Sequence, residues 1–222
     1  MDQKPPSIRS LVVVPAILTL AVTIVRLVGE LNGWSPLLFG TASADGPKAI
    51  IGISWLIFVF GLWFGFRVQR SSAGLAKPGK TLLCCLLPIA ILFGGFALSE
   101  KLGLVSMPTP EAPGEVKGLG WFLGISAVAA LTSIVIWARI GVILLVYSLL
   151  ARLPVVVVTW FALERGWETH HVKLPPEFTA PPADERFFVL AMPQVTFWPV
   201  LTIVFGTVMA ALGALIAGRR KS

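Results

Sequence analysis

A single arginine lies inside an otherwise apolar stretch of this 222-residue chain, in the segment YSLLARLPVVVV that begins at Tyr147. Arg152 is followed two residues later by Pro154. This proline cannot donate a backbone hydrogen bond to the carbonyl of Leu150, so it would kink a helix there. A guanidinium at mid-membrane costs about 2.5–3.5 kcal/mol on insertion scales, and such a residue normally faces the bundle interior and has a partner. Arg152 and Pro154 therefore form a candidate intramembrane polar site that could take an anion or a lipid headgroup.

The arginine also has a structural interpretation, in which the carbonyl freed by Pro154 accepts its hydrogen bond inside an inert helix. No apolar stretch has an Asp or Glu near its centre, and the nearest acids, Glu30 and Glu164, lie at the ends of two stretches. The partners expected for Arg152 are Glu30, a backbone carbonyl, a lipid phosphate, a substrate anion or another subunit.

Arg26 and Glu30 are four residues apart, so they share one face near the end of the first apolar stretch. We expect a salt bridge between them, with both charged groups reaching water. The alternative is that the pair extends to Arg152 on a neighbouring helix, which would add both residues to the intramembrane polar site.

Three possible metal ligands, Glu168, His170 and His171, stand close together in the segment WETHH. Imidazole and carboxylate groups bind zinc, and a metal here would indicate an enzyme acting at the outer face. The three residues are nearly consecutive, however, and the chain has neither HExxH nor a second separated ligand pair. They are weak candidates, and we expect solvated loop residues without a metal or cofactor.

The chain lacks the common catalytic motifs. It has no G-x-S-x-G, P-loop, G-x-G-x-x-G or CxxCH pattern, and both histidines lie outside the apolar stretches. The two cysteines, Cys84 and Cys85, are adjacent, which makes a disulfide between them strained. We expect no enzymatic activity.

The composition is that of an integral membrane protein. Apolar residues make up 56% of the chain and charged residues 13%, against about 45–50% and about 25% in soluble domains, and the mean hydropathy is +0.85. The apolar residues form runs long enough to cross about 30 Å of hydrocarbon. The predicted fold is all-α, one polytopic membrane domain over residues 1–222 with a bundle of six transmembrane helices. The predicted spans are about 11–28, 50–68, 81–98, 119–138, 142–163 and 195–217.

The positive charges predict the orientation. They gather in the N-terminal tail, in the segment 67–80 and in the C-terminal GRRKS, whereas the other loops are neutral or acidic. The positive-inside rule then places both termini in the cytoplasm, in the plasma or inner membrane. Because these charges lie at the ends of apolar runs and not on one basic face, the net charge of +7 does not indicate nucleic-acid binding.

Residues 119–163 allow two arrangements. One continuous helix would be about 67 Å long, twice the membrane thickness, so we expect two spans with a tight turn at residues 139–141. The alternative is a longer tilted helix to about Leu150, followed by a half-helix that does not cross.

Small residues four apart mark three faces on which helices could pack closely or chains could associate. They are Gly61 with Gly65, Gly120 with Gly124, and Gly206 with Ala210.

The function expected from the sequence is that of a non-enzymatic accessory or anchoring subunit of a membrane assembly. Its expected partners are the lipid bilayer, other membrane subunits and a second copy of the chain. The alternative is a small transporter or channel component with its site at Arg152 and Pro154. A polar cavity reaching Arg152 would favour the alternative.

Overall fold

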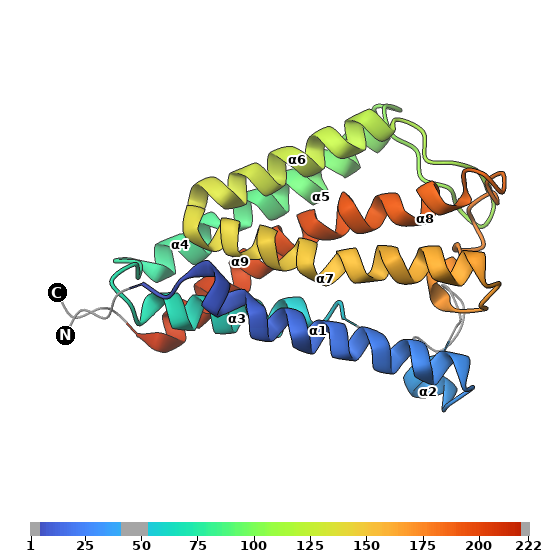
Figure 1. Ribbon diagram of the computed structural model, residues 1–222. Coiled ribbons are helices and arrows are strands. Elements are labelled where there is room, and N and C mark those ends of the chain that lie inside the picture. The colour runs from blue at the N-terminus through green and yellow to red at the C-terminus, as the bar shows by residue number, and fades with distance from the viewer. Residues whose placement is uncertain (1–4, 41–52, 219–222) are drawn as a thin grey trace.

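A computed structural model describes residues 5–40 and 53–218, and in these ranges the chain is helical, with isolated bridge pairs in place of strands (Figure 1). Turns and loops connect the helices, and a short 3-10 helix, η1, precedes α8. The elements are α1 (Ile8–Leu31), α2 (Pro36–Phe39), α3 (Leu56–Gln69), α4 (Pro78–Cys84), α5 (Leu86–Lys101), α6 (Leu119–Ile136), α7 (Ala138–Glu164), η1 (His170–Val172), α8 (Arg186–Val195) and α9 (Phe197–Ala217).

Five helical stretches in the described chain are long and apolar enough to cross a membrane. The remaining apolar helix, α3, has 14 residues and is therefore about 21 Å long, shorter than the hydrocarbon core. Such helices are compatible with a multi-pass membrane protein, which the composition predicts. The five stretches are Ile8–Leu31, Pro78–Lys101, Leu119–Ile136, Ala138–Glu164 and Arg186–Ala217.

The helices α3 and α9 pack with almost no side chain between their backbones. A Cβ atom on Gly61 would lie 2.8 Å from the carbonyl oxygen of Gly206, and one on Gly65 would overlap the carbonyl group of Ala210. Two of the three small-residue faces seen in the sequence therefore contact each other within the chain.

The third small-residue face lies on α6 and points outward. Gly120 and Gly124 are exposed, and a Cβ atom added to either would meet nothing within 4 Å in the part of the chain that the structure describes.

The polypeptide reverses direction between α6 and α7 at Trp137, whose φ of −149° and ψ of 79° are not helical. The tight turn is possible because Gly141 brings the start of α7 against Ile134: a Cβ atom on this glycine would lie 2.8 Å from the Cα atom of Ile134. Residues 119–163 thus form two helices, as expected, with the turn two residues earlier than predicted. The alternative of one long helix and a half-helix is wrong.

A second break separates α8 from α9 at Thr196, with φ −114° and ψ −72°. Prolines flank it, Pro193 inside α8 and Pro199 in the first turn of α9. Pro199 cannot donate to the carbonyl of Val195, so the helical hydrogen-bond ladder is interrupted here. Residues 186–194 lie before the predicted start of the sixth span, and they form a helix that leads directly into it.

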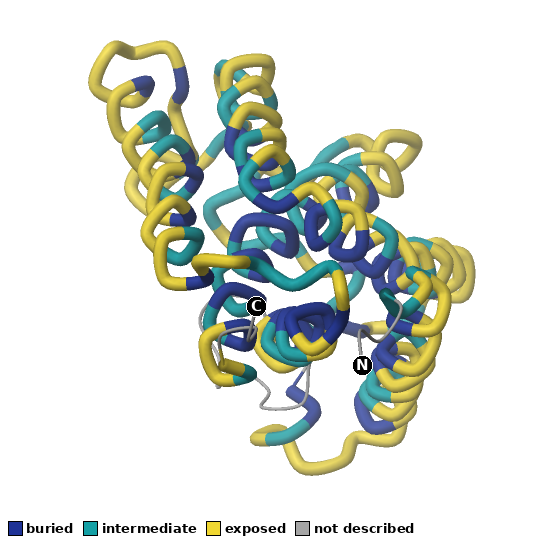
Figure 2. Tube along the Cα trace, turned by 90° about the vertical axis from the view of Figure 1, so that its left-hand side faces the viewer, coloured by how far each residue is buried: buried dark blue, intermediate teal, exposed yellow. Residues whose placement is uncertain are grey.

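The two ends of the bundle differ in charge. Both ends of the described chain lie at one end of the bundle (Figure 1), the end that faces the viewer in Figure 2. We call it the basic end, because its charged residues among those described are Arg9, Arg67, Arg70, Lys77, Lys80 and Arg139. The opposite end, the loop end, holds every acidic residue of the described chain, at the final turns of α1, α5 and α7 and in the loops 102–118 and 165–185.

Candidate functional site

Arg152 lies on the inward face of α7 and is only 5% exposed. Its Nη1 donates a hydrogen bond to Oε1 of Gln194 over 3.2 Å. Its guanidinium carbon stands 4.2 Å from the centre of the Trp198 ring, a cation–π contact. Gln194 belongs to the last turn of α8 and Trp198 to the first turn of α9, so Arg152 joins α7 to the break between these two helices.

The break at Thr196 explains why a cation is stable at this place. The last carbonyls of α8 lack partners within the helix, and a helix C-terminus carries partial negative charge. Arginine suits the position better than lysine, because its planar guanidinium can stack on an indole and donate sideways at the same time. Gln194 was not among the partners expected from the sequence, and Glu30 makes its contacts at the loop end.

Tyr147 continues the polar connection from α7 to α1. Its hydroxyl lies 2.9 Å from Oγ1 of Thr19, and that threonine donates its own proton to the carbonyl of Pro15 over 2.8 Å. The tyrosine is therefore the donor. Its ring packs edge-on against Phe60 and Phe64 of α3, with centroids 5.5 Å and 5.7 Å away.

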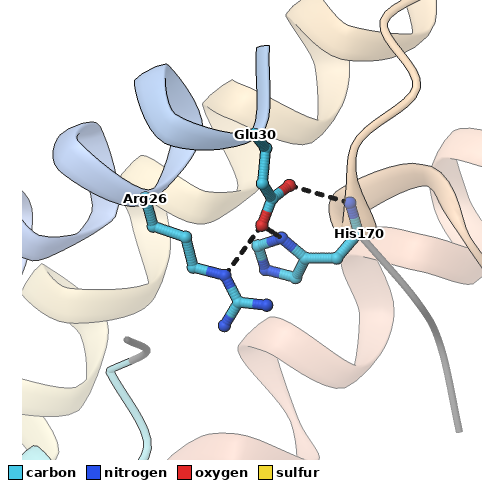
Figure 3. A network of polar contacts seen from close by, with 3 residues as sticks. All are labelled: Arg26, Glu30 and His170. Carbon is cyan, nitrogen blue, oxygen red and sulfur yellow. Dashed lines mark hydrogen bonds and ion pairs between the residues drawn. The ribbon is translucent and has the colours of Figure 1, made fainter. Parts of the chain in front are cut away.

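A second polar cluster lies at the loop end, around Glu30 (Figure 3). The side chain of Glu30 has no exposed surface. Its Oε1 accepts from Nε of Arg26 over 2.8 Å and from Nδ1 of His170 over 2.5 Å, and its Oε2 accepts from the backbone N–H of His170 over 3.0 Å. Because an ionised carboxylate only accepts, Nδ1 carries the imidazole proton.

The predicted salt bridge between Arg26 and Glu30 is present, but the expectation that both groups reach water is wrong for Glu30. The loop between α7 and α8 covers the carboxylate, and His170 supplies two of its donors. The cluster thereby links the C-terminal end of α1 to this loop.

His171 lies beside the cluster, with its ring centre 3.9 Å from that of His170. Its Nε2 is buried without a hydrogen-bond partner. Burial, reinforced by the charge of His170, lowers the pKa of His171 to about 3, so this imidazole is neutral at physiological pH.

The residues Glu168, His170 and His171 do not assemble as the metal site that their types suggest. In residues 5–40 and 53–218, no three His, Cys, Asp or Glu side chains group closely enough to hold a metal ion. His170 instead uses its Nδ1 and its backbone N–H on Glu30.

Neither a protein-family model nor a curated protein nor a solved structure matches this chain.

Proposed function

We propose that this chain is a non-enzymatic accessory or anchoring subunit of a membrane assembly. The observation that carries the proposal is the environment of Arg152, which is 5% exposed and contacts two side chains of its own chain. Two cavities of about 320 and 390 Å³ lie at the basic end, and Arg152 lines neither of them. A charge with these contacts stabilises the bundle and is not accessible to a transported solute.

We further propose that the subunit crosses the membrane six times with both termini in the cytoplasm. Supporting this are the alternating directions of the helices in Figure 1 and the contrast between the basic end and the loop end. The additional crossing in this proposal is helix α3. Labelling of N-terminal and C-terminal tags from one side of sealed plasma- or inner-membrane vesicles tests this, and tags in opposite compartments would exclude it.

The surface proposed for assembly is the outward face of α6 with Gly120 and Gly124. The other small-residue faces are used inside the chain, whereas this one is open for a helix of another subunit or of a second copy.

Native mass spectrometry in a mild detergent tests the proposed assembly. We expect a stoichiometric complex that Gly124→Ile dissociates. Gly94→Ile is the matched control, because Gly94 is an equally open helical glycine on α5 outside this face. A monomeric chain, or equal loss of the complex in both variants, would refute the assembly surface.

One observation favours the alternative function, a small transporter or channel component. Arg152 stands next to a broken helix, and broken helices line the substrate sites of transporters. A cysteine introduced at Gln194, labelled with a membrane-impermeant reagent, distinguishes the two functions. The subunit proposal expects no labelling in intact membranes, whereas rapid labelling would favour a water-filled route to Arg152.

A further inference from the structure

The basic end carries positive charge that the described chain does not neutralise. Six lysines and arginines lie there, and every acid of the described residues lies at the loop end. The described ion pairs, Arg26 with Glu30 and His170 with Glu30, also belong to the loop end. This surface is therefore suited to attract an anion.

Two of these lysines stand at the start of α4 between two hollows. Lys77 and Lys80 are three positions apart in the first turn, and both are exposed. The cavities of about 320 and 390 Å³ share these two lysines and Ala76. The first cavity reaches Ile136 at the end of α6, and the second reaches Leu215 near the end of α9.

The surface that lines these hollows is mostly apolar. Ile136 and Leu215 belong to two membrane-crossing helices. Along the following turns of α4 and α5, Leu83, Leu86 and Leu87 are 69%, 59% and 56% exposed. The lysines thus stand where a charged headgroup would lie, with a strip of apolar surface continuing from them into the bilayer.

We propose that Lys77 and Lys80 bind the phosphate of an anionic phospholipid whose acyl chains lie along α4 and α5. Two ammonium groups supply the charge, and their aliphatic stems let the heads reach headgroup depth. The exposed leucines favour a lipid over a free phosphate ion, because only a lipid has acyl chains that can cover the apolar strip. The site is independent of the proposed function as a subunit.

Native mass spectrometry of the purified full chain, with equal amounts of phosphatidylglycerol and phosphatidylcholine, tests the proposal. We expect preferential retention of phosphatidylglycerol. The double variant K77Q/K80Q should lower this preference about 30-fold, at about fivefold for each charge lost. The matched control is K101Q/K117Q, which removes the same charge from two exposed lysines at the loop end and should change the preference less than about twofold.

Equal losses in the two double variants would mean that net charge alone attracts the lipid, and would overturn the site. Displacement of phosphatidylglycerol by millimolar inorganic phosphate would show that the lysines bind a free anion, and would overturn the proposal that they bind a lipid.

A second measurement uses the native thiols, and its first comparison, between two lipid compositions, needs no variant. Cys84 lines the first cavity and is exposed, whereas Cys85 is buried. We expect an uncharged maleimide to label Cys84 more slowly in nanodiscs of phosphatidylglycerol and phosphatidylcholine than in phosphatidylcholine alone. This slowing should disappear in K77Q/K80Q and persist in K101Q/K117Q. An unchanged rate in the native chain would argue against a lipid in this cavity.

Discussion

The contact between Arg152 and Gln194 predicts a specific energetic coupling between α7 and α8. Gln194→Leu removes the acceptor of a buried guanidinium, and Arg152→Met leaves the amide of Gln194 unpaired and removes the stacking on Trp198. A hydrogen bond to a charged group contributes about 1.5–3 kcal/mol, and a desolvated cation–π contact contributes about 2 kcal/mol. We therefore expect Gln194→Leu to lower the free energy of unfolding by about 2 kcal/mol. Arg152→Met loses both contacts and should lower it by about 4 kcal/mol.

The double variant R152M/Q194L should lose about 4 kcal/mol, no more than Arg152→Met alone, because the second substitution removes a group that has already lost its partner. The resulting coupling free energy of about 2 kcal/mol can be measured by unfolding the four proteins in a mild detergent with increasing dodecyl sulfate. Arg165→Met provides the control, because Arg165 is exposed and stands farther from its aromatic neighbours, 5.9 Å from the Phe161 ring centre. The loss in free energy of unfolding caused by Arg165→Met should add to the loss caused by Gln194→Leu.

Additivity of Arg152→Met and Gln194→Leu within about 0.5 kcal/mol would refute the argument. Arg152 would then be held by lipid, water or another molecule, and the observation that supports the subunit function would be lost.

Three further predictions concern the loop end and the core. Glu30→Gln should lower the free energy of unfolding by about 2–3 kcal/mol, because a buried carboxylate with three donors is replaced by a neutral amide. Thermal unfolding measures this loss of stability. The control is Glu164→Gln, which changes an exposed residue and should have little effect. Stability should fall as the pH falls below about 6.5, by about 1.4 kcal/mol at pH 5.5, since the pKa of His171 is about 3 when folded and the unfolded chain therefore binds the additional proton. The stability that the neutral His171 contributes is complete above pH 6.5 and is lost progressively toward pH 3. His171→Leu should therefore remove this pH dependence from the free energy of unfolding measured between pH 7 and 5. An unchanged pH dependence would contradict the attribution to His171. Gly65→Ile should prevent recovery of a monodisperse folded chain in size-exclusion chromatography, because its side chain would occupy the backbone of α9 at Ala210, whereas Gly94→Ile meets open space and should be recovered normally.

The helices could be predicted from the sequence because hydrocarbon imposes their length and their hydrogen bonding. The reversal near Gly141 was likewise visible, since one uninterrupted helix would have been twice the thickness of the bilayer. The exact turn at Trp137 depends on how closely α7 approaches Ile134, and the local sequence does not encode that distance.

The contacts of the polar residues could not be predicted, because they join distant parts of the chain. The acceptor of Arg152 lies 42 positions further along the chain, immediately before the predicted start of the sixth span at residue 195. The apolar run FFVLAMP before Gln194 is the feature from which a longer helix, with Gln194 inside it, could have been predicted. His170 lies 140 positions from Glu30, and a histidine in a polar loop gives no local sign of such a contact.

The contact between α3 and α9 has a consequence for biogenesis. Helix α3 is shorter than the hydrocarbon core, and its glycines pack against the backbone of α9, which is synthesised much later. Until α9 emerges, this early segment lacks its main packing partner, and we expect the insertion machinery or a chaperone to retain it. Chains that terminate before α9 would therefore expose an unanchored segment to quality-control proteases, even though most of their apolar helices have already been synthesised.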